Sequence, residues 1–172
     1  MGQPASIHSW HTAFLSLTCR DLIAMEYRFA EASDVALLAQ LNEQLIRDEG
    51  HRSRLSAKEV EPRLRRWFDE GYRAVLFEDG GEVVAYALYR PAESDDAGQE
   101  AIYLRQFLVR RECRGRGVGR EAFGLLEERI WPRGCRITAD VLCTNKSAYG
   151  FWKAVGFRDY AILMERDPAH QH

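Results

Sequence analysis

The chain has 172 residues, of which 46% are hydrophobic and 29% are charged, and its formal net charge is −2. This length and balance predict one globular domain with a hydrophobic core. The near-neutral charge provides no general attraction to nucleic acid or to an anionic membrane, so a binding site for a polyanion must be local.

The cysteines and the N-terminal residues suggest where the protein works and where its domain begins. The cysteines, which show neither a Cys-x-x-Cys pair nor a histidine at zinc-site spacing, are Cys19, Cys113, Cys135 and Cys143. We therefore expect reduced thiols, a cytoplasmic location and no metal. Residues 1–24 hold an apolar segment too short to span a bilayer, so we expect an N-terminal extension or over-long start, a domain over 25–166 and a tail over 167–172.

The first half of the domain predicts a strand, two helices and a hairpin. Helices are indicated by apolar residues at helical spacing, and the hairpin is indicated by Asp-Gly-Gly between two apolar runs. In chain order the expected elements are a strand over 26–30, a helix capped by Ser33, a helix over 56–70 opened by a Ser56–Glu59 capping box, and strands over 72–78 and 82–90.

The second half predicts strands and helices in alternation. The expected elements are a strand over 101–109, a helix over 117–130, a strand over 136–142, a helix over 146–155 and a strand over 157–164. Hairpins pair antiparallel, whereas the strand-helix-strand unit over 101–142 favours a parallel pair. We therefore expect an α/β fold whose central sheet is mixed but mostly antiparallel and is flanked by about four helices.

A glycine-rich segment joins the strand over 101–109 to the following helix. It reads Arg114-Gly115-Arg116-Gly117-Val118-Gly119 and is followed by Arg120. The first backbone N–H groups of a helix lack intrahelical partners, and glycines allow an anion to approach them closely. With its interleaved arginines, this segment predicts a cradle for a pyrophosphate; a plain mobile turn is the other interpretation of the segment taken alone.

Three kinds of nucleotide-binding loop compete for this segment. A Walker A loop is excluded, because it requires a lysine and none occurs between residues 59 and 145. A dinucleotide fingerprint counted from Gly115 requires a third glycine where Arg120 stands, although Asp140 follows at the distance of a ribose-binding acid. The third kind is the acyl-coenzyme A loop of the GNAT N-acetyltransferases: Arg or Gln, two residues, Gly, one residue, then Gly or Ala. The segment resembles it at every fixed position.

A second motif about thirty residues later strengthens this resemblance. The segment Asn145-Lys-Ser-Ala-Tyr-Gly-Phe-Trp-Lys-Ala-Val-Gly-Phe157 is similar to the GNAT pattern of Asn, Ala, an apolar-aromatic pair, a basic residue and Gly-Phe. The chain therefore resembles a GNAT superfamily member over 25–166. The resemblance implies the single-domain GNAT fold and acetyl transfer from acetyl-CoA to a primary amine of a small molecule, amino acid or peptide.

The resemblance also implies which residues bind acetyl-CoA. In that fold the strand over 101–109 splays from its parallel neighbour, and its exposed backbone pairs with the pantetheine arm, while the glycine-rich loop holds the pyrophosphate. Asn145 contacts the arm as well as capping its helix, and Trp152 packs beside the arm. The cofactor-binding residues so implied are Phe107, Leu108, Val109, Arg114, Gly115, Arg116, Gly117, Val118, Gly119, Arg120, Asn145 and Trp152.

The resemblance indicates the catalytic residues less directly than it indicates the residues that bind acetyl-CoA. The backbone N–H of Val109 is the candidate donor to the oxyanion. Many GNAT enzymes place a proton-donating tyrosine where Trp152 stands, so Tyr149, three residues earlier, is the candidate acid. Glu49 is the candidate base. The candidate acceptor-binding residues are Asp48, His51, Arg90, Arg105 and Gln106, of which the arginines suit a carboxylate on the acceptor.

Two other functions compete with acetyl transfer. The missing tyrosine and the absence of a carboxylate at strand positions 105 and 106 favour a non-catalytic acyl-CoA-binding or regulatory module. A dinucleotide-binding oxidoreductase is the second alternative, and it leaves the motif at 145–157 unexplained. We expect no nucleic-acid or membrane partner, and a homodimer is left open.

Overall fold

Five strands form one sheet in the computed structural model of the chain, which describes residues 25–94 and 98–166. Their spatial order follows the sequence: β1 (Glu26–Phe29), β2 (Arg73–Asp79), β3 (Glu82–Ala92), β4 (Ala101–Val109) and β5 (Arg136–Ala139). The first four strands pair antiparallel and β5 pairs parallel to β4. The predicted mixed sheet is confirmed; the expected extension 1–24 and tail 167–172 lie outside the described residues.

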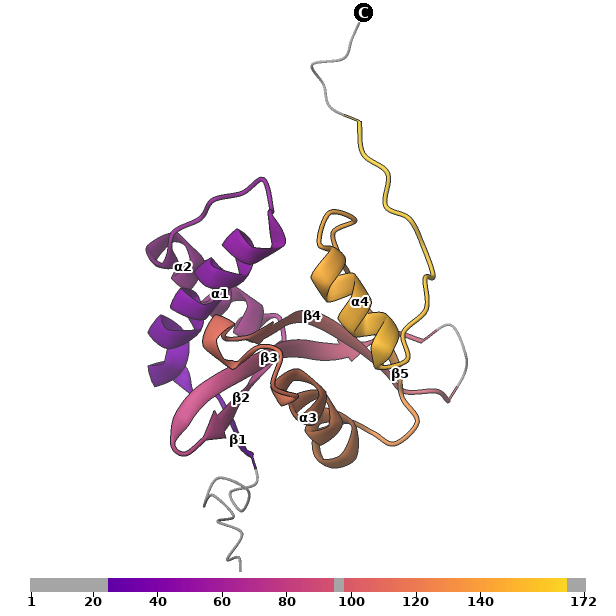
Figure 1. The fold of residues 1–172 in the computed structure, drawn as a ribbon, viewed down its shortest axis with the longest axis horizontal. Coiled ribbons are helices and arrows are strands. Elements are labelled where there is room, and N and C mark those ends of the chain that lie inside the picture. Colours follow the sequence, from indigo (N-terminus) through magenta and orange to yellow (C-terminus); the bar gives the residue numbers. More distant parts are fainter. Residues whose placement is uncertain (1–24, 95–97, 167–172) are drawn as a thin grey trace, which may run out of the picture.

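The helices cover both faces of this sheet (Figure 1). They are α1 (Val35–Glu49), α2 (Ala57–Asp69), α3 (Val118–Leu125) and α4 (Lys146–Ala154), with short 3-10 turns η1 (Ala32–Asp34) and η2 (Arg111–Cys113) and a π-helical turn η3 (Leu126–Ile130). Successive side chains of β2 and β3 point to opposite faces of the sheet, so the hydrophobic core has two parts. Leu76 and Tyr86 pack with α1 and α2, whereas Phe77 and Ala87 pack with α3 and α4.

Local signals placed several helix ends correctly. Ser56 and Glu59 form the predicted capping box at the start of α2, and the Asn145 side chain caps α4 by accepting a hydrogen bond from Ala148 N–H. The cap predicted at Ser33 is wrong. Here Glu31 and Asp34 form the capping box around η1, and Ser33 lies within that turn.

The last predicted strand, over 157–164, is not formed. After Gly156 the described chain runs along the outside of α4 (Figure 1), and its apolar side chains Ile162, Leu163 and Met164 are 83–94% exposed. An apolar run becomes a strand only when a sheet edge pairs with it, and β5, four residues long, pairs only with β4 in the described structure. The strand predicted over 136–142 also ends early, at Ala139.

An aromatic cluster joins β4, α3 and α4. Phe123 is its centre, with ring centroids 6.4 Å from Phe107, 5.9 Å from Trp131, 5.7 Å from Trp152 and 5.8 Å from Phe157. Edge-to-face packing of this kind adds to the free energy gained by burial. The cluster therefore fixes α3 and α4 relative to the central strand.

Replacing Phe123 by Ala should lower the free energy of unfolding by about 3–5 kcal/mol, because the deletion leaves a cavity in a buried cluster. Urea denaturation followed by circular dichroism measures the change. The control is Phe29→Ala on β1, since that side chain is 48% exposed and should cost much less. Equal losses in the two variants would contradict the central role of the cluster.

Candidate active site

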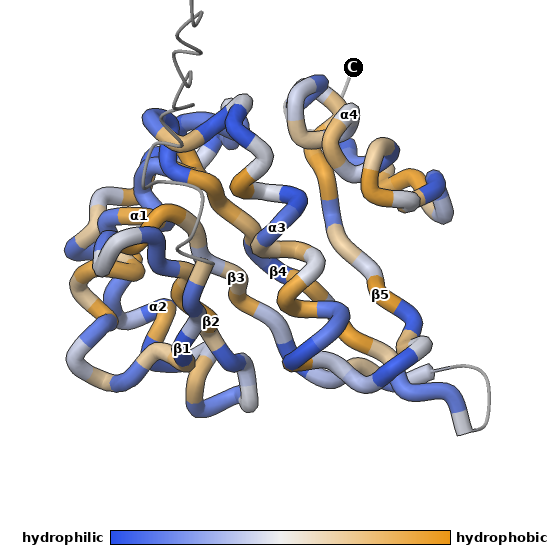
Figure 2. The backbone as a smooth tube through the Cα atoms, turned by 60° about the horizontal axis from the view of Figure 1, so that its bottom comes forward, coloured by the Kyte–Doolittle hydropathy of each residue, from blue (hydrophilic) through white to orange (hydrophobic). Residues whose placement is uncertain are grey.

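A cleft opens where β4 and β5 part. The two strands pair from Ala101 with Arg136 to Leu104 with Ala139, and β5 ends there while β4 continues to Val109. Figure 2 shows the backbone of β4 and that of β5 running together and then diverging. The cleft has a volume of about 500 Å³ and is lined by β4, the glycine-rich loop, the segment after β5, the start of α4 and the end of α1.

The parting of the strands leaves backbone groups of β4 without a strand partner. From Gln106 to Val109, β4 pairs with β3 along one edge, and no described strand pairs with its other edge. Arg110 N–H donates to Val84 O on β3, so by alternation the Val109 backbone groups point to the cleft side. The Val109 carbonyl there accepts a hydrogen bond from Arg114 Nε at 2.8 Å.

A β-bulge in β4 aims two consecutive side chains at the same face. The pairing with β3 passes from Gln106 opposite Leu88 directly to Leu104 opposite Tyr89, so Arg105 is the extra residue. Arg105 and Gln106 consequently both reach the α1–α2 side, and both line the cleft. This is the position at which the sequence lacks a carboxylate.

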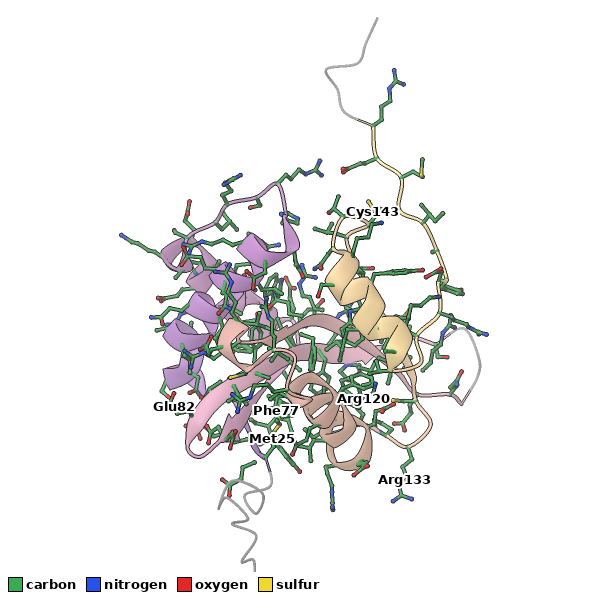
Figure 3. The ribbon with its side chains drawn as sticks, viewed as in Figure 1. Met25, Phe77, Glu82, Arg120, Arg133 and Cys143 are labelled. Atoms are coloured by element: carbon green, nitrogen blue, oxygen red, sulfur yellow. The ribbon has the colours of Figure 1, made fainter. Side chains whose placement is uncertain are left out.

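The glycine-rich loop has room for a ligand. Gly115 and Gly117 adopt left-handed φ angles of 72° and 85°, and a Cβ built on either would have no atom within 4 Å. Gly117 is the N-cap residue of α3, so the loop delivers free backbone N–H groups to the cleft. Arg120 is in the first turn of α3 (Figure 3). It lines the cleft and takes part in none of the ion pairs of the described residues.

Asp48, at the end of α1, ties the loop to the rest of the domain. Its Oδ1 pairs with Arg111, at 2.8 Å from Arg111 Nε, and its Oδ2 pairs with Arg114. Burial alone would raise the pKa of Asp48, but the two guanidinium groups hold it below its usual value. Asp48 was predicted to bind the acceptor; in the structure both of its oxygens pair with arginines.

Glu49 is the cleft-lining carboxylate of α1 that lacks an arginine partner. Its pKa is raised by burial and by the neighbouring charge of Asp48. Close by, a buried chain of hydrogen bonds runs from Asn42 Nδ2 to Tyr86 OH (3.4 Å) and from Tyr86 OH to Gln106 Oε1 (3.1 Å). The Gln106 oxygen is thus occupied, and the side chain is held in place beside the cleft.

The helix α4 forms the facing wall. Asn145 lines the cleft while its Oδ1 caps the helix, and Trp152 is 8% exposed among the aromatic rings. Phe151, which the sequence analysis did not single out, stacks on Phe107 with centroids 5.7 Å apart and also lines the cleft. The apolar-aromatic pair in the second motif was the signal that could have identified it.

The structure does not bring every predicted site residue to the cleft. Tyr149 is exposed, and its hydroxyl donates to Asp159 Oδ2 at 3.0 Å, on the side of the C-terminal segment. His51 Nδ1 accepts from Ser53 N–H. The predicted residues that do not line the cleft are Tyr149, His51, Arg90, Arg116 and Val118, the last of which packs against the aromatic side of the core. The other predicted residues line it.

The described residues contain no cluster of three or more His, Cys, Asp or Glu side chains arranged to hold a metal. Over the same residues, no helix has the length and apolar character needed to cross a membrane.

Comparison with known proteins identifies the class of protein that this fold and cleft define. The sequence profile of the acetyltransferase (GNAT) family matches residues 37–157, and the chain belongs to this family. The sheet has one parallel pair rather than the all-parallel order of a dinucleotide-binding fold, so the oxidoreductase alternative is wrong.

Individual relatives are more distant. A thialysine N-epsilon-acetyltransferase from Bos taurus is 36% identical over 78 residues, which is 45% of this chain and 45% of the relative, so the match spans less than half of either protein. A protein from Clostridium difficile 630 described as a possible acetyltransferase superposes with a TM-score of 0.69 at 15% identity, covering 84% and 97% of the two chains. An aminoglycoside N-acetyltransferase solved with CoA superposes with a TM-score of 0.64 at 14% identity, covering 84% and 95%.

Gly119 on α3 lies close to side chains of both α4 and β4. A Cβ at this position would lie 3.2 Å from the Phe151 ring and 3.3 Å from Val109 Cγ2. Gly119→Val should therefore lower the free energy of unfolding by about 1–3 kcal/mol through overpacking. Gly124→Val in the same helix is the matched control, because a Cβ there meets nothing within 4 Å and valine favours helix more than glycine does. Thermal denaturation of both variants tests the difference, and similar melting temperatures would argue against the close contact.

Proposed function

We propose that this chain binds acetyl-CoA in the cleft and transfers the acetyl group to a primary amine of a small-molecule or amino-acid or peptide acceptor. The observation that carries the proposal is the parting of β4 from β5 with the glycine-rich loop at its end. An extended amide-bearing arm matches an unpaired strand edge, and a pyrophosphate matches free N–H groups at a helix start.

In this proposal, different residues around the cleft bind different parts of acetyl-CoA. The exposed edge of β4 at Phe107 and Val109 faces the pantetheine amides, and the Asn145 amide lies on the opposite wall. Gly115 and Gly117 allow the phosphates to reach the loop, where Arg120 supplies positive charge. Arg114, which bonds the Val109 carbonyl and Asp48, acts as a positioning residue that shapes the loop.

In the proposed reaction the thioester supplies an activated acetyl group. The acceptor nitrogen forms a bond to the acetyl carbon, the carbon–sulfur bond breaks, and its electron pair leaves on sulfur. Val109 N–H donates to the acetyl oxygen as negative charge develops there. Glu49 takes one proton from the ammonium group of the acceptor before attack, because a half-buried carboxyl with a raised pKa holds a proton more readily than an exposed one. The nitrogen releases its second proton to solvent as the carbon–nitrogen bond forms.

The proton for the leaving sulfur comes from solvent in this scheme. Trp152 occupies the position of the usual tyrosine and its indole is not an acid at physiological pH, while the Tyr149 hydroxyl is turned to Asp159. A thiolate leaves without prior protonation. The same feature is what favours the second candidate, a non-catalytic acyl-CoA-binding module, which would bind the same ligand without turnover.

Isothermal titration with acetyl-CoA tests the binding step. We expect binding by the wild type, with NAD as a ligand that does not bind, and loss of acetyl-CoA binding in Gly117→Trp, whose side chain would fill the cradle. Gly81→Trp is the matched control, because Gly81 has a similar φ of 82° but lies in the β2–β3 turn, away from the cleft. Absence of binding by the folded wild type would refute the proposal; binding without thiol release from any amine would favour the non-catalytic module.

The pH dependence tests Glu49 as the base. Glu49→Gln should lower kcat about 10²–10⁴-fold. The ratio of wild-type to variant kcat/KM, in which titration of the acceptor amine cancels, should rise with pH and level off above the raised pKa of Glu49. Glu43→Gln on the same helix, where Glu43 pairs with Arg47 at the surface, is the control. A flat ratio near one would exclude Glu49 from proton transfer.

A further inference from the structure

Three arginines lie over three aromatic rings on the α2 side of the cleft. Arg105 Cζ is 4.3 Å from the Trp67 ring centroid and 5.6 Å from that of Tyr72; Arg63 Cζ is 4.7 Å from Trp67; Arg90 Cζ is 5.4 Å from Tyr72 and 5.9 Å from Tyr103. The rings pack against one another at 6.2 Å and 6.5 Å. We call Arg63, Arg90 and Arg105 the arginine cluster.

The arginine cluster has no carboxylate partner. None of the ion pairs within residues 25–94 and 98–166 includes Arg63, Arg90 or Arg105. Arg63 and Arg105 are half-buried, and burial together with the charges of Arg105 and Arg66 lowers the pKa of Arg63. Like charges gathered at a half-buried surface repel one another, and an anion placed among them removes that cost.

The arginine cluster differs from the arginines around Asp48 in what the chain places beside the guanidinium groups. Where Arg111 and Arg114 come together, the chain supplies a carboxylate of its own. In the arginine cluster it supplies aromatic rings over which the guanidinium groups lie, and no ion pair of the described residues uses their N–H groups. Arg105 donates a long hydrogen bond, 3.4 Å from its Nη1 to Tyr72 OH. A planar carboxylate is the anion that guanidinium groups bind in a bidentate manner.

Arg105 connects the arginine cluster to the cleft. The β-bulge makes it line the cleft beside Gln106, while its guanidinium lies over Trp67. Asp140 also lines the cleft, and its Oδ2 accepts a hydrogen bond from Tyr103 OH at 2.7 Å. Burial and Asp140 raise the pKa of Tyr103 to about 12, so this hydroxyl remains a donor.

We propose that the acceptor amine carries a carboxylate, and that Arg105, assisted by Arg63 and Arg90, binds it. This inference rests on the proposed function, in which the amine is acetylated beside Val109. Val109 lies four positions after Arg105 along β4, so their Cα atoms are roughly 13 Å apart at 3.3 Å per residue. The amine and the carboxylate therefore sit at opposite ends of an elongated acceptor, as in an ω-amino acid.

Steady-state kinetics with ε-aminocaproate and its primary amide tests the proposal. The two acceptors share chain length and amine and differ only in the negative charge. We expect a higher kcat/KM for the acid, and Arg105→Gln should lower that value about 10–100-fold, mainly through KM, while lowering the value for the amide much less. Arg63→Gln should have a smaller effect in the same direction. Arg66→Gln on the same helix, where Arg66 pairs with Glu70, is the matched control.

A second titration separates the failure of this inference from the failure of the proposed function. Caproate has the carboxylate but no amine, so it should bind to the wild type and not to Arg105→Gln, whether or not acetyl transfer occurs. Equal kcat/KM for acid and amide in the wild type would overturn the carboxylate site. So would caproate binding that Arg105→Gln leaves intact. Absence of acetyl transfer with retained, Arg105-dependent caproate binding would instead refute the catalytic proposal alone.

Discussion

The structure depends on one interrupted hydrogen-bond ladder. The parallel pairing of β4 with β5 ends at Leu104 and Ala139, although β4 continues to pair with β3 from Gln106 to Val109. A buried backbone group needs a partner, so a strand edge that loses its neighbour either closes, faces water or binds a ligand. Here the aromatic cluster around Phe123 holds α3 and α4 against one face of the sheet, α1 and α2 pack on the other face, and the edge stays open.

Charge is distributed around this opening in three different ways. Asp48 neutralises Arg111 and Arg114 and so shapes the glycine-rich loop. Arg120 faces the cleft without an ion-pair partner among the described residues, and the arginine cluster rests on aromatic rings instead of acids. A nearly neutral chain thereby keeps two separate positive regions, one beside the proposed phosphates and one beside the proposed acceptor.

Predictions from local patterns succeeded where the controlling physics is local. The capping box at Ser56, the cap at Asn145 and the glycine-rich start of α3 depend on residues within a few positions of one another. Predictions failed where a distant partner decides the outcome. The apolar run at 157–164 forms no strand, because no sheet edge of the described structure pairs with it. The hydrogen bond from the Tyr149 hydroxyl to Asp159 in the C-terminal segment is likewise decided by tertiary structure.

The sequence by itself determined the family, the order of elements from β1 to α4 and the residues of the loop, because two motifs at fixed spacing encode a strand, a phosphate cradle and a helix start. Only the tertiary structure decided which charges remain available. Asp48 and Asp140 have the same chemistry in the sequence, yet one pairs with two arginines and the other accepts from a tyrosine. Arg105 faces α2 because β4 carries a bulge there. Such partnerships join residues tens of positions apart, and packing against a shared core selects them.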